Sequence, residues 1–340
     1  MKLYTDYSGK FQMYIPIDWH YKNPTLYNSV DDGKPHAFAL YDDILGAFQI
    51  SCKPVNDHIS KLIKTRNEPI QSSNAKKLIF SEVKSVIGKT EMFMFSCAVD
   101  DHYLFATYTI SDKDKKLKDK YNEELKKVRE VLISIKFIKP EFRQKVIALR
   151  RFDLFMASLA TTIDLKNRAM KNNSFIEYVV LSANHIDALL RLSIILKYQI
   201  ENKNDEIDTK FLSQLESEKP IMEREVYKLT FDKGIISQQI YDDLEKLYKQ
   251  RNRVVHRYII TDIRTDEVLE IAYSYGTLGE KIGNIVNNLE QEQVIQKVGI
   301  HKANHELGKK PDGAELEKLI SSIKDKHGKV KFEDILNRED

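Results

Sequence analysis

The spacing of apolar residues changes near residue 140, and this change constrains the fold more than any other feature of the sequence. Before it, short β-prone runs such as Phe11–Ile15 are separated by turn signals. From Glu141 onward, apolar residues recur three or four positions apart, which is the spacing of one face of an α-helix. The 340 residues are therefore predicted to form two successive domains, an α+β domain and an all-α bundle.

The first part of the chain carries two hairpin signals. Residues 36–41 and 46–52 are β-prone and flank an Asp-Asp pair, and residues 91–97 and 103–110 flank another. Aspartate is frequent in tight turns because its side chain bonds to nearby backbone groups. Each pair of runs is therefore predicted to form an antiparallel hairpin.

A charged helix from about Lys115 to Leu132 and a short strand at 134–138 complete the pattern of the first domain. This order of elements, together with Gly9-Lys10-Phe11 leading into Ile15-Pro16-Ile17-Asp18-Trp19, resembles the Mog1/PsbP-like fold. The resemblance covers residues 1–139 and implies an antiparallel sheet with helices that acts as a binding or docking module. Trp19 is then expected to be a packing anchor.

The second part of the chain is predicted to be a helical domain over residues 141–290, followed by a tail over 291–340. The first expected helix covers 142–170, and a second begins at the cap Asn173-Ser174. A third covers 211–229 with a break at Pro220. The last two cover 238 to about 260, with Ser237 as cap, and 265–289. The tail contains a linker at 308–313 and a short helix at 314–326.

One motif in the helical part carries chemistry. Arg251 and Asn252 are followed by three residues and then His256. Asn252 and His256 lie four positions apart and share a helix face. Arg251 and His256 diverge by about 140° on an ideal helix, so one chain presents an incomplete site. Two motifs that meet across a two-fold interface would complete it.

This R-N-x3-H motif, placed late in a helical bundle, resembles that of the HEPN domains. The resemblance implies a homodimeric, metal-independent endoribonuclease without a cofactor, whose two motifs line one cleft. His256 would move a proton near neutral pH, and the guanidinium of Arg251 would stabilise the phosphorane. Asn252 would orient the ribose or phosphate, while Arg253 and Arg257 would bind RNA phosphates.

The same run also fits the longer form R-x4-H-x-Y, which ends at Tyr258. In HEPN toxins that are paired with a minimal nucleotidyltransferase antitoxin, the matching tyrosine is modified with AMP. By position the resemblance makes Tyr258 a modification site, and a packing tyrosine is the alternative. The implied role is a toxin or antiphage defence effector. An antitoxin or defence partner would be a separate protein, because this chain has no nucleotidyltransferase signature.

Two further sets of polar residues have both a structural and a functional interpretation. Asp187 and Arg191 lie four positions apart with the acid first, which is a stabilising helix pair. Support of the active cleft by Asp187 is the functional alternative. His301 and His305 have metal-ligand spacing but no evident third ligand, so no metal site is predicted.

The remaining features concern the cellular location of the protein and an alternative function. Cys52 and Cys97 lie in apolar runs and are expected to be buried, although a disulfide between them stays open. The sequence has no signal peptide pattern and no apolar run of about 18 residues, so we expect a cytoplasmic protein without a membrane segment. The rival function is a non-catalytic HEPN dimerisation scaffold whose N-terminal domain recruits a partner.

Overall fold

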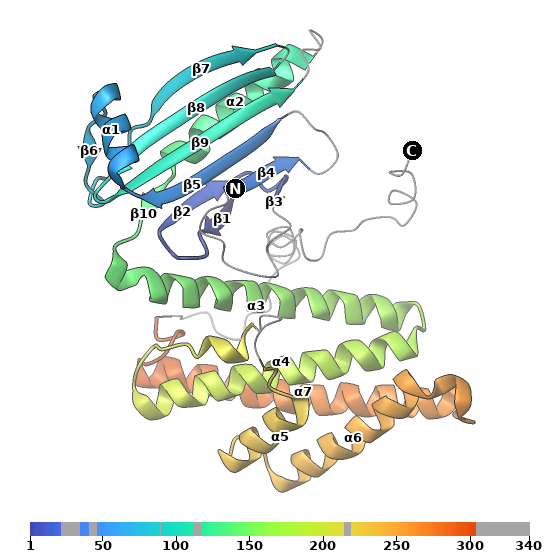
Figure 1. The fold of residues 1–340 in the computed structure, drawn as a ribbon. Helices are drawn as coiled ribbons and strands as arrows, with labels where there is room; N and C mark the ends of the chain where they lie inside the picture. Colours follow the sequence, from blue (N-terminus) through green and yellow to red (C-terminus); the bar gives the residue numbers. More distant parts are fainter. Residues whose placement is uncertain (22–34, 41–45, 89, 112–116, 214–218, 304–340) are drawn as a thin grey trace. The chain divides into compact units, whose positions relative to one another are not determined.

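The computed structural model describes residues 1–21, 35–40, 46–88, 90–111, 117–213 and 219–303. A sheet-rich region comes first and a helical region follows it, so the protein is α+β, as predicted (Figure 1). The described chain divides into two compact units, Met1–Arg150 and Arg151–Ala303. The division falls inside helix α3 (Pro140–Lys171).

The first unit contains two sheets. The smaller sheet has the order β1–β2–β10, formed by Lys2–Thr5, Phe11–Ile15 and Lys136–Phe137. The larger sheet has the order β3–β4–β5–β9–β8–β6, with β7 also paired to β8. Its strands are β3 (Trp19–Tyr21), β4 (His36–Leu40), β5 (Ala47–Pro54), β6 (Ile70–Gln71), β7 (Ser81–Ile87), β8 (Thr90–Val99) and β9 (His102–Ser111).

Both predicted hairpins are confirmed within the described residues. Strands β4 and β5 pair antiparallel, and so do β8 and β9. Asp100 in the β8–β9 turn has a φ of 47°, in the left-handed region that aspartate tolerates better than most residues. The Asp42-Asp43 turn lies outside the described residues.

The core of the first unit joins the sheets to helix α2 (Lys118–Ile133), while α1 (Asp57–Arg66) lies between β5 and β6 in the chain. The apolar residues predicted to line one helix face, Leu125, Val128 and Leu132, are all buried. The indole of Trp19 is buried and donates a hydrogen bond to Glu124 Oε2 at 2.9 Å. Cys52 and Cys97 are buried free thiols, and burial raises the pKa of each to about 12.

The second unit is a helical bundle. After α3 it contains α4 (Phe175–Asn202), the 3-10 turn η3 (Thr209–Phe211), α5 (Glu223–Asp232), α6 (Gln238–His256), the 3-10 turn η4 (Tyr258–Ile260) and α7 (Thr265–Gln296). Ser237 caps α6 as predicted, because its hydroxyl accepts a hydrogen bond from the amide of Ile240. Ser174 occupies the N-cap of α4 without a side-chain cap bond.

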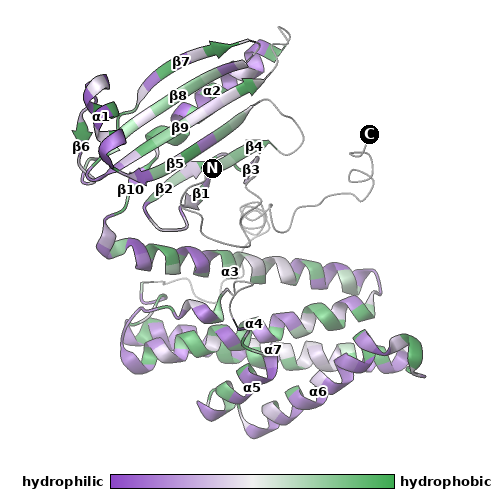
Figure 2. Cartoon of the chain, viewed as in Figure 1, coloured by the Kyte–Doolittle hydropathy of each residue, from purple (hydrophilic) through white to green (hydrophobic). Residues whose placement is uncertain are grey.

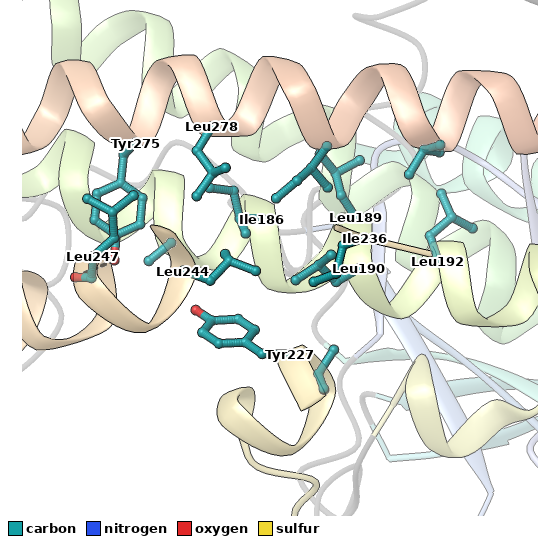
Figure 3. Packing of buried hydrophobic residues seen from close by; sticks show 14 of the residues in the cluster. Ile186, Leu189, Leu190, Leu192, Tyr227, Ile236, Leu244, Leu247, Tyr275 and Leu278 are labelled. Carbon is teal, nitrogen blue, oxygen red and sulfur yellow. Dashed lines mark hydrogen bonds between the residues drawn. The ribbon is translucent and has the colours of Figure 1, made fainter. Parts of the chain in front are cut away.

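Helix α4 is the central element of the bundle. Its apolar residues face α5, α6 and α7, and Figure 3 shows Ile186 and Leu190 among side chains from these neighbours. By length and composition α4 could cross a membrane, so the expectation that no apolar run reaches about 18 residues was wrong. In the structure 61% of its most apolar 18-residue window is buried, as in a helix at the core of a bundle.

Three predicted boundaries in the helical region were wrong. The stretch predicted at 211–229 is a 3-10 turn followed by α5, which starts only after Pro220, and residues 214–218 lie outside the described residues. Helix α6 ends at His256, and not near Ile260, because Arg257 leaves the helical conformation with φ −128° and ψ 9°. Helix α7 continues to Gln296, so the predicted start of the tail at 291 lies inside a helix. The predicted linker at 308–313 and helix at 314–326 lie outside the described residues.

Candidate active site on helix α6

The guanidinium of Arg251 is held in place by a carboxylate of the neighbouring helix α5. Its Nη1 donates to Glu223 Oε2 at 2.6 Å, and both side chains are only 17% exposed. Its Nη2 donates to Asn252 Oδ1 at 3.2 Å. Two predicted site residues, Arg251 and Asn252, therefore contact each other, and a third residue that the sequence did not indicate joins them.

Two tyrosine side chains complete the surroundings of the Arg251–Glu223 pair. The Arg251 guanidinium lies over the ring of Tyr248, 4.8 Å from its centroid. The buried hydroxyl of Tyr227 donates to the other carboxylate oxygen of Glu223. Burial acts to lower the pKa of Arg251, but the hydrogen bond and charge of Glu223 outweigh it and raise that pKa. The cation is thus firmly paired in this conformation.

Asp187 lies within the electrostatic range of the same cluster. Its Oδ2 accepts from Arg191 Nε at 2.7 Å, which confirms the predicted helix pair. Burial raises the pKa of Asp187, the Arg191 pair opposes this, and the charge of Glu223 adds to the rise. Its Oδ1 is buried without a hydrogen-bond partner. Asp187 is therefore close enough to affect Arg251 and Glu223, although no direct hydrogen bond joins it to either in the described residues.

His256 is presented differently from Arg251. It is the last residue of α6 and is exposed to solvent, four positions after Asn252 on the same helix. Across the described ranges, no hydrogen bond or ion pair joins the imidazole to Arg251 or Asn252. The structure thus brings Arg251 and Asn252 together. His256 makes no such contact with Arg251, as their angular separation on the helix predicts.

The remaining motif residues lie on the surface. Arg253 forms an ion pair with Glu267 of α7 at 3.2 Å, with both side chains 43% exposed. Arg257 and Tyr258 are exposed beyond the end of α6. Tyr258 belongs to η4 and so lies outside helix α6, which carries Arg251. The Tyr258 side chain is 42% exposed.

A groove of about 350 Å³ lies between α6 and α7, next to the Arg253–Glu267 pair. Its charged lining is mixed, with Lys246 and Lys281 against Asp243, Glu267 and Glu270. A lining with both positive and negative side chains does not favour the negatively charged backbone of RNA over other ligands. The groove therefore adds no phosphate-binding surface to the motif.

The described residues contain no group of three or more His, Cys, Asp or Glu side chains that could hold a metal ion. His301 lies beside Glu290, with 3.6 Å between Nε2 and Oε1, and its ring contacts Phe152. His305, its predicted companion, lies outside the described residues.

The residues that sequence reasoning missed are Glu223, Tyr227 and Tyr248. Glu223 precedes Arg251 by 28 positions, so no local spacing rule connects the two. Tyr248 was within reach, because it lies three positions before Arg251 on one helix.

No family model matches this sequence, and no curated protein matches it either. A crystal structure of a protein from Bacteroides thetaiotaomicron VPI-5482 is similar, with 14% sequence identity and a TM-score of 0.29. The match covers 81% of this chain and 97% of that chain. At this TM-score the likeness supports no conclusion about fold or function.

Proposed function

We propose that the helical unit is a HEPN-type, metal-independent endoribonuclease that acts on RNA as a homodimer. The observation that carries the proposal is the Arg251-Asn252-x3-His256 motif at the C-terminal end of an amphipathic bundle helix. A cation suited to phosphate, an orienting amide and an exposed imidazole are the groups that cleavage by the 2′-hydroxyl requires.

Each residue has a distinct role in the proposed reaction. His256 transfers a proton at the 2′-hydroxyl or at the leaving oxygen, and its exposure at the helix end gives RNA access to the ring. Arg251 stabilises the phosphorane through its paired donors, and Asn252 orients the guanidinium and the ribose. Arg253 and Arg257 hold flanking phosphates.

The pairing of Arg251 with Glu223 adds a condition to this mechanism. The guanidinium must leave Glu223, or share one donor with the RNA phosphate, before it can stabilise the transition state. The backbone phosphate gains negative charge as the phosphorane forms, so at that point it can compete with one carboxylate for the same donors. RNA binding is therefore expected to rearrange the α5–α6 contact.

A second copy of the chain would complete the site. Val255, Tyr258, Ile259 and Ile260 are exposed apolar side chains directly around His256, with Ile259 95% exposed and Ile260 80% exposed. Figure 2 shows this hydrophobic colouring at the end of α6. Clustered exposed apolar side chains are typical of protein interfaces. Dimerisation here would bring two His256 imidazoles, and the Arg251 groups of both copies, to one interface.

In the cell, the proposed role is a cytoplasmic toxin or antiphage defence effector. The N-terminal unit, proposed to be Mog1/PsbP-like, would dock a signal or partner protein. A separate antitoxin would silence the nuclease by AMP modification of Tyr258, whose exposure supports this assignment.

The test is cleavage of labelled total RNA and tRNA in EDTA by the wild type, Arg251→Ala and His256→Ala. We expect the wild type to leave 2′,3′-cyclic phosphate ends and both variants to lose cleavage while remaining folded. Mass spectrometry first checks that Tyr258 of the wild type is unmodified. If this unmodified protein cleaves no RNA, the proposal is contradicted.

The second candidate is a non-catalytic dimerisation scaffold. The Arg251–Glu223 pair favours it, because a half-buried ion pair between two helices is a common structural device. Overexpression separates the two functions. A nuclease slows growth and His256→Ala relieves this, whereas with a scaffold neither protein affects growth.

A further inference from the structure

The groove between α6 and α7 has an apolar floor and a charged rim. The floor includes Leu247, Ile271 and Leu278, which are all buried in the core of the bundle. The exposed charged side chains of the rim include Lys246 of α6 and Glu270 and Lys281 of α7. A hollow with apolar walls and a few polar groups is the usual form of a site for a small ligand or a single ring.

The charged groups of this rim are not paired with one another. Among the described residues, no ion pair or side-chain hydrogen bond joins Glu270, Lys246 or Lys281 to another protein group. Glu267, a carboxylate in the same lining, does have a partner, because it pairs with Arg253. Free donors and acceptors therefore surround one apolar floor.

The groove also adjoins a residue that is proposed to hold the RNA backbone. Gln250 lines the groove, and Arg253 follows it three positions later on the same side of α6. Glu267, the partner of Arg253, belongs to the lining as well. An RNA strand whose phosphate is held at Arg253 therefore has a neighbouring base beside the groove.

We propose, on the basis of the nuclease function proposed above, that this groove binds an unpaired guanine base near the cleavage site. The edge of a base has both donors and acceptors, so it fits a lining of mixed charge, which the uniformly negative backbone does not. The adjacent N1–H and N2–H donors of guanine match the two oxygens of the Glu270 carboxylate. Lys246 and Lys281 are the donors available to its O6 and N7 acceptors.

Tyr273 supplies a stacking surface for the base. Its side chain is 77% exposed and lines the groove. Proteins that bind single-stranded RNA stack unpaired bases on such aromatic rings. Stacking tolerates any base, because every base has a π-face. Tyr273 therefore contributes affinity, while Glu270 selects guanine.

The experiment measures the binding of guanosine 5′-monophosphate and uridine 5′-monophosphate to the full chain by calorimetry, in EDTA and at one salt concentration. Both nucleotides carry the same phosphate, so the difference between their affinities reports the base. We expect the guanosine nucleotide to bind at least about fivefold more tightly, because uracil has a single N–H donor for the carboxylate. This binding requires no cleavage, so it separates the groove from the nuclease activity.

Three variants assign the binding to the groove, and circular dichroism checks that each is folded. Glu270→Gln should reduce the guanosine affinity to about that of the uridine nucleotide, because an amide has only one acceptor oxygen. Glu280→Gln is the matched control, since Glu280 is exposed on the same helix but does not line the groove, and it should change neither affinity. Tyr273→Ala should weaken both nucleotides by a similar factor.

Equal affinity of the wild type for the two nucleotides, or no binding of either, would overturn the proposal. A guanine preference that persists in Glu270→Gln would overturn it too, because the base would then bind elsewhere. A wild type that cleaves RNA but shows no guanine preference would keep the nuclease function and lose only the assignment of the groove.

Discussion

At the scale of single residues, the setting of Arg251 determines what the motif can do. Glu223, Asn252 and the Tyr248 ring hold the guanidinium between α5 and α6. The Glu223 carboxylate, which helps to orient the guanidinium, also balances its positive charge. In the proposed mechanism, the RNA phosphate must therefore displace the Glu223 carboxylate before it binds the guanidinium.

Replacement of Glu223 by Gln should therefore have two opposite effects. We expect the free energy of unfolding to fall by about 1–3 kcal/mol, because a half-buried cation loses its charged partner. RNA affinity should rise, because Arg251 is freed. Urea unfolding measures the first effect, and fluorescence anisotropy with a short RNA in EDTA measures the second.

A matched control lies between the same two helices. Arg224 donates two hydrogen bonds to Glu245, but the Arg224 side chain is exposed and screened by water. Glu245→Gln should cost less stability and leave RNA affinity unchanged. Equal effects of the two substitutions would show that Glu223 has no special relation to the site.

His185 predicts a dependence of stability on pH. Burial lowers its pKa to about 4 in the folded protein, below the unfolded value of 6.5. The unfolded chain then binds more protons between these values, so this group's contribution falls as pH decreases through that window. Between pH 7 and pH 5 the wild type should lose about 2 kcal/mol more than His185→Gln. Urea unfolding of both proteins at the two pH values checks this, and parallel losses would refute it.

At the scale of elements, α4 organises the helical unit. It contributes most of the fully buried apolar side chains of the bundle core and contacts α7 along much of its length. Figure 3 shows how α5, α6 and α7 converge on it. The positions of Glu223 and Arg251 relative to each other therefore depend on how α5 and α6 pack against α4.

Leu190→Ala tests this dependence. Leu190 is fully buried, so the truncation should cost about 2–5 kcal/mol through lost burial and the cavity left behind. Leu269→Ala on α7 is the control, because that side chain is 47% exposed. Thermal unfolding of both variants should separate them clearly, and similar Tm values would argue against α4 as the core.

At the scale of the whole molecule, the proposed activity depends on a second copy. The exposed apolar residues at the end of α6 adjoin His256, so they are well placed to join the two motifs. The sheet-rich unit has its own core, separate from that of the bundle. This is consistent with a division into a docking unit and an effector unit.

The double variant Ile259→Lys, Ile260→Lys should be monomeric by analytical ultracentrifugation, with the wild type dimeric. Stability of the fold should be little changed, because both side chains are solvent-exposed. Ile295→Lys on α7 is the matched control, since Ile295 is also 80% exposed but lies far along the chain. It should leave the dimer intact. A dimeric double variant would place the interface elsewhere.

Local patterns predicted a good part of this protein. Apolar spacing located α3, α4 and most of α7, and turn signals located both hairpins, because these features depend on residues close in sequence. The predicted Asp187–Arg191 pair likewise joins near neighbours on one helix.

Other features were decided only by the tertiary structure. The partner of Arg251 is a carboxylate 28 residues away, and Lys166 meets His185 only because α3 packs on α4. Helix α6 ends at His256 and not near Ile260, because the backbone at Arg257 is not helical despite the helix propensity of the sequence there. Helical and strand periods are local properties that the sequence determines by itself. Ion pairs, burial and the pKa values that follow depend on which distant segments the core brings together.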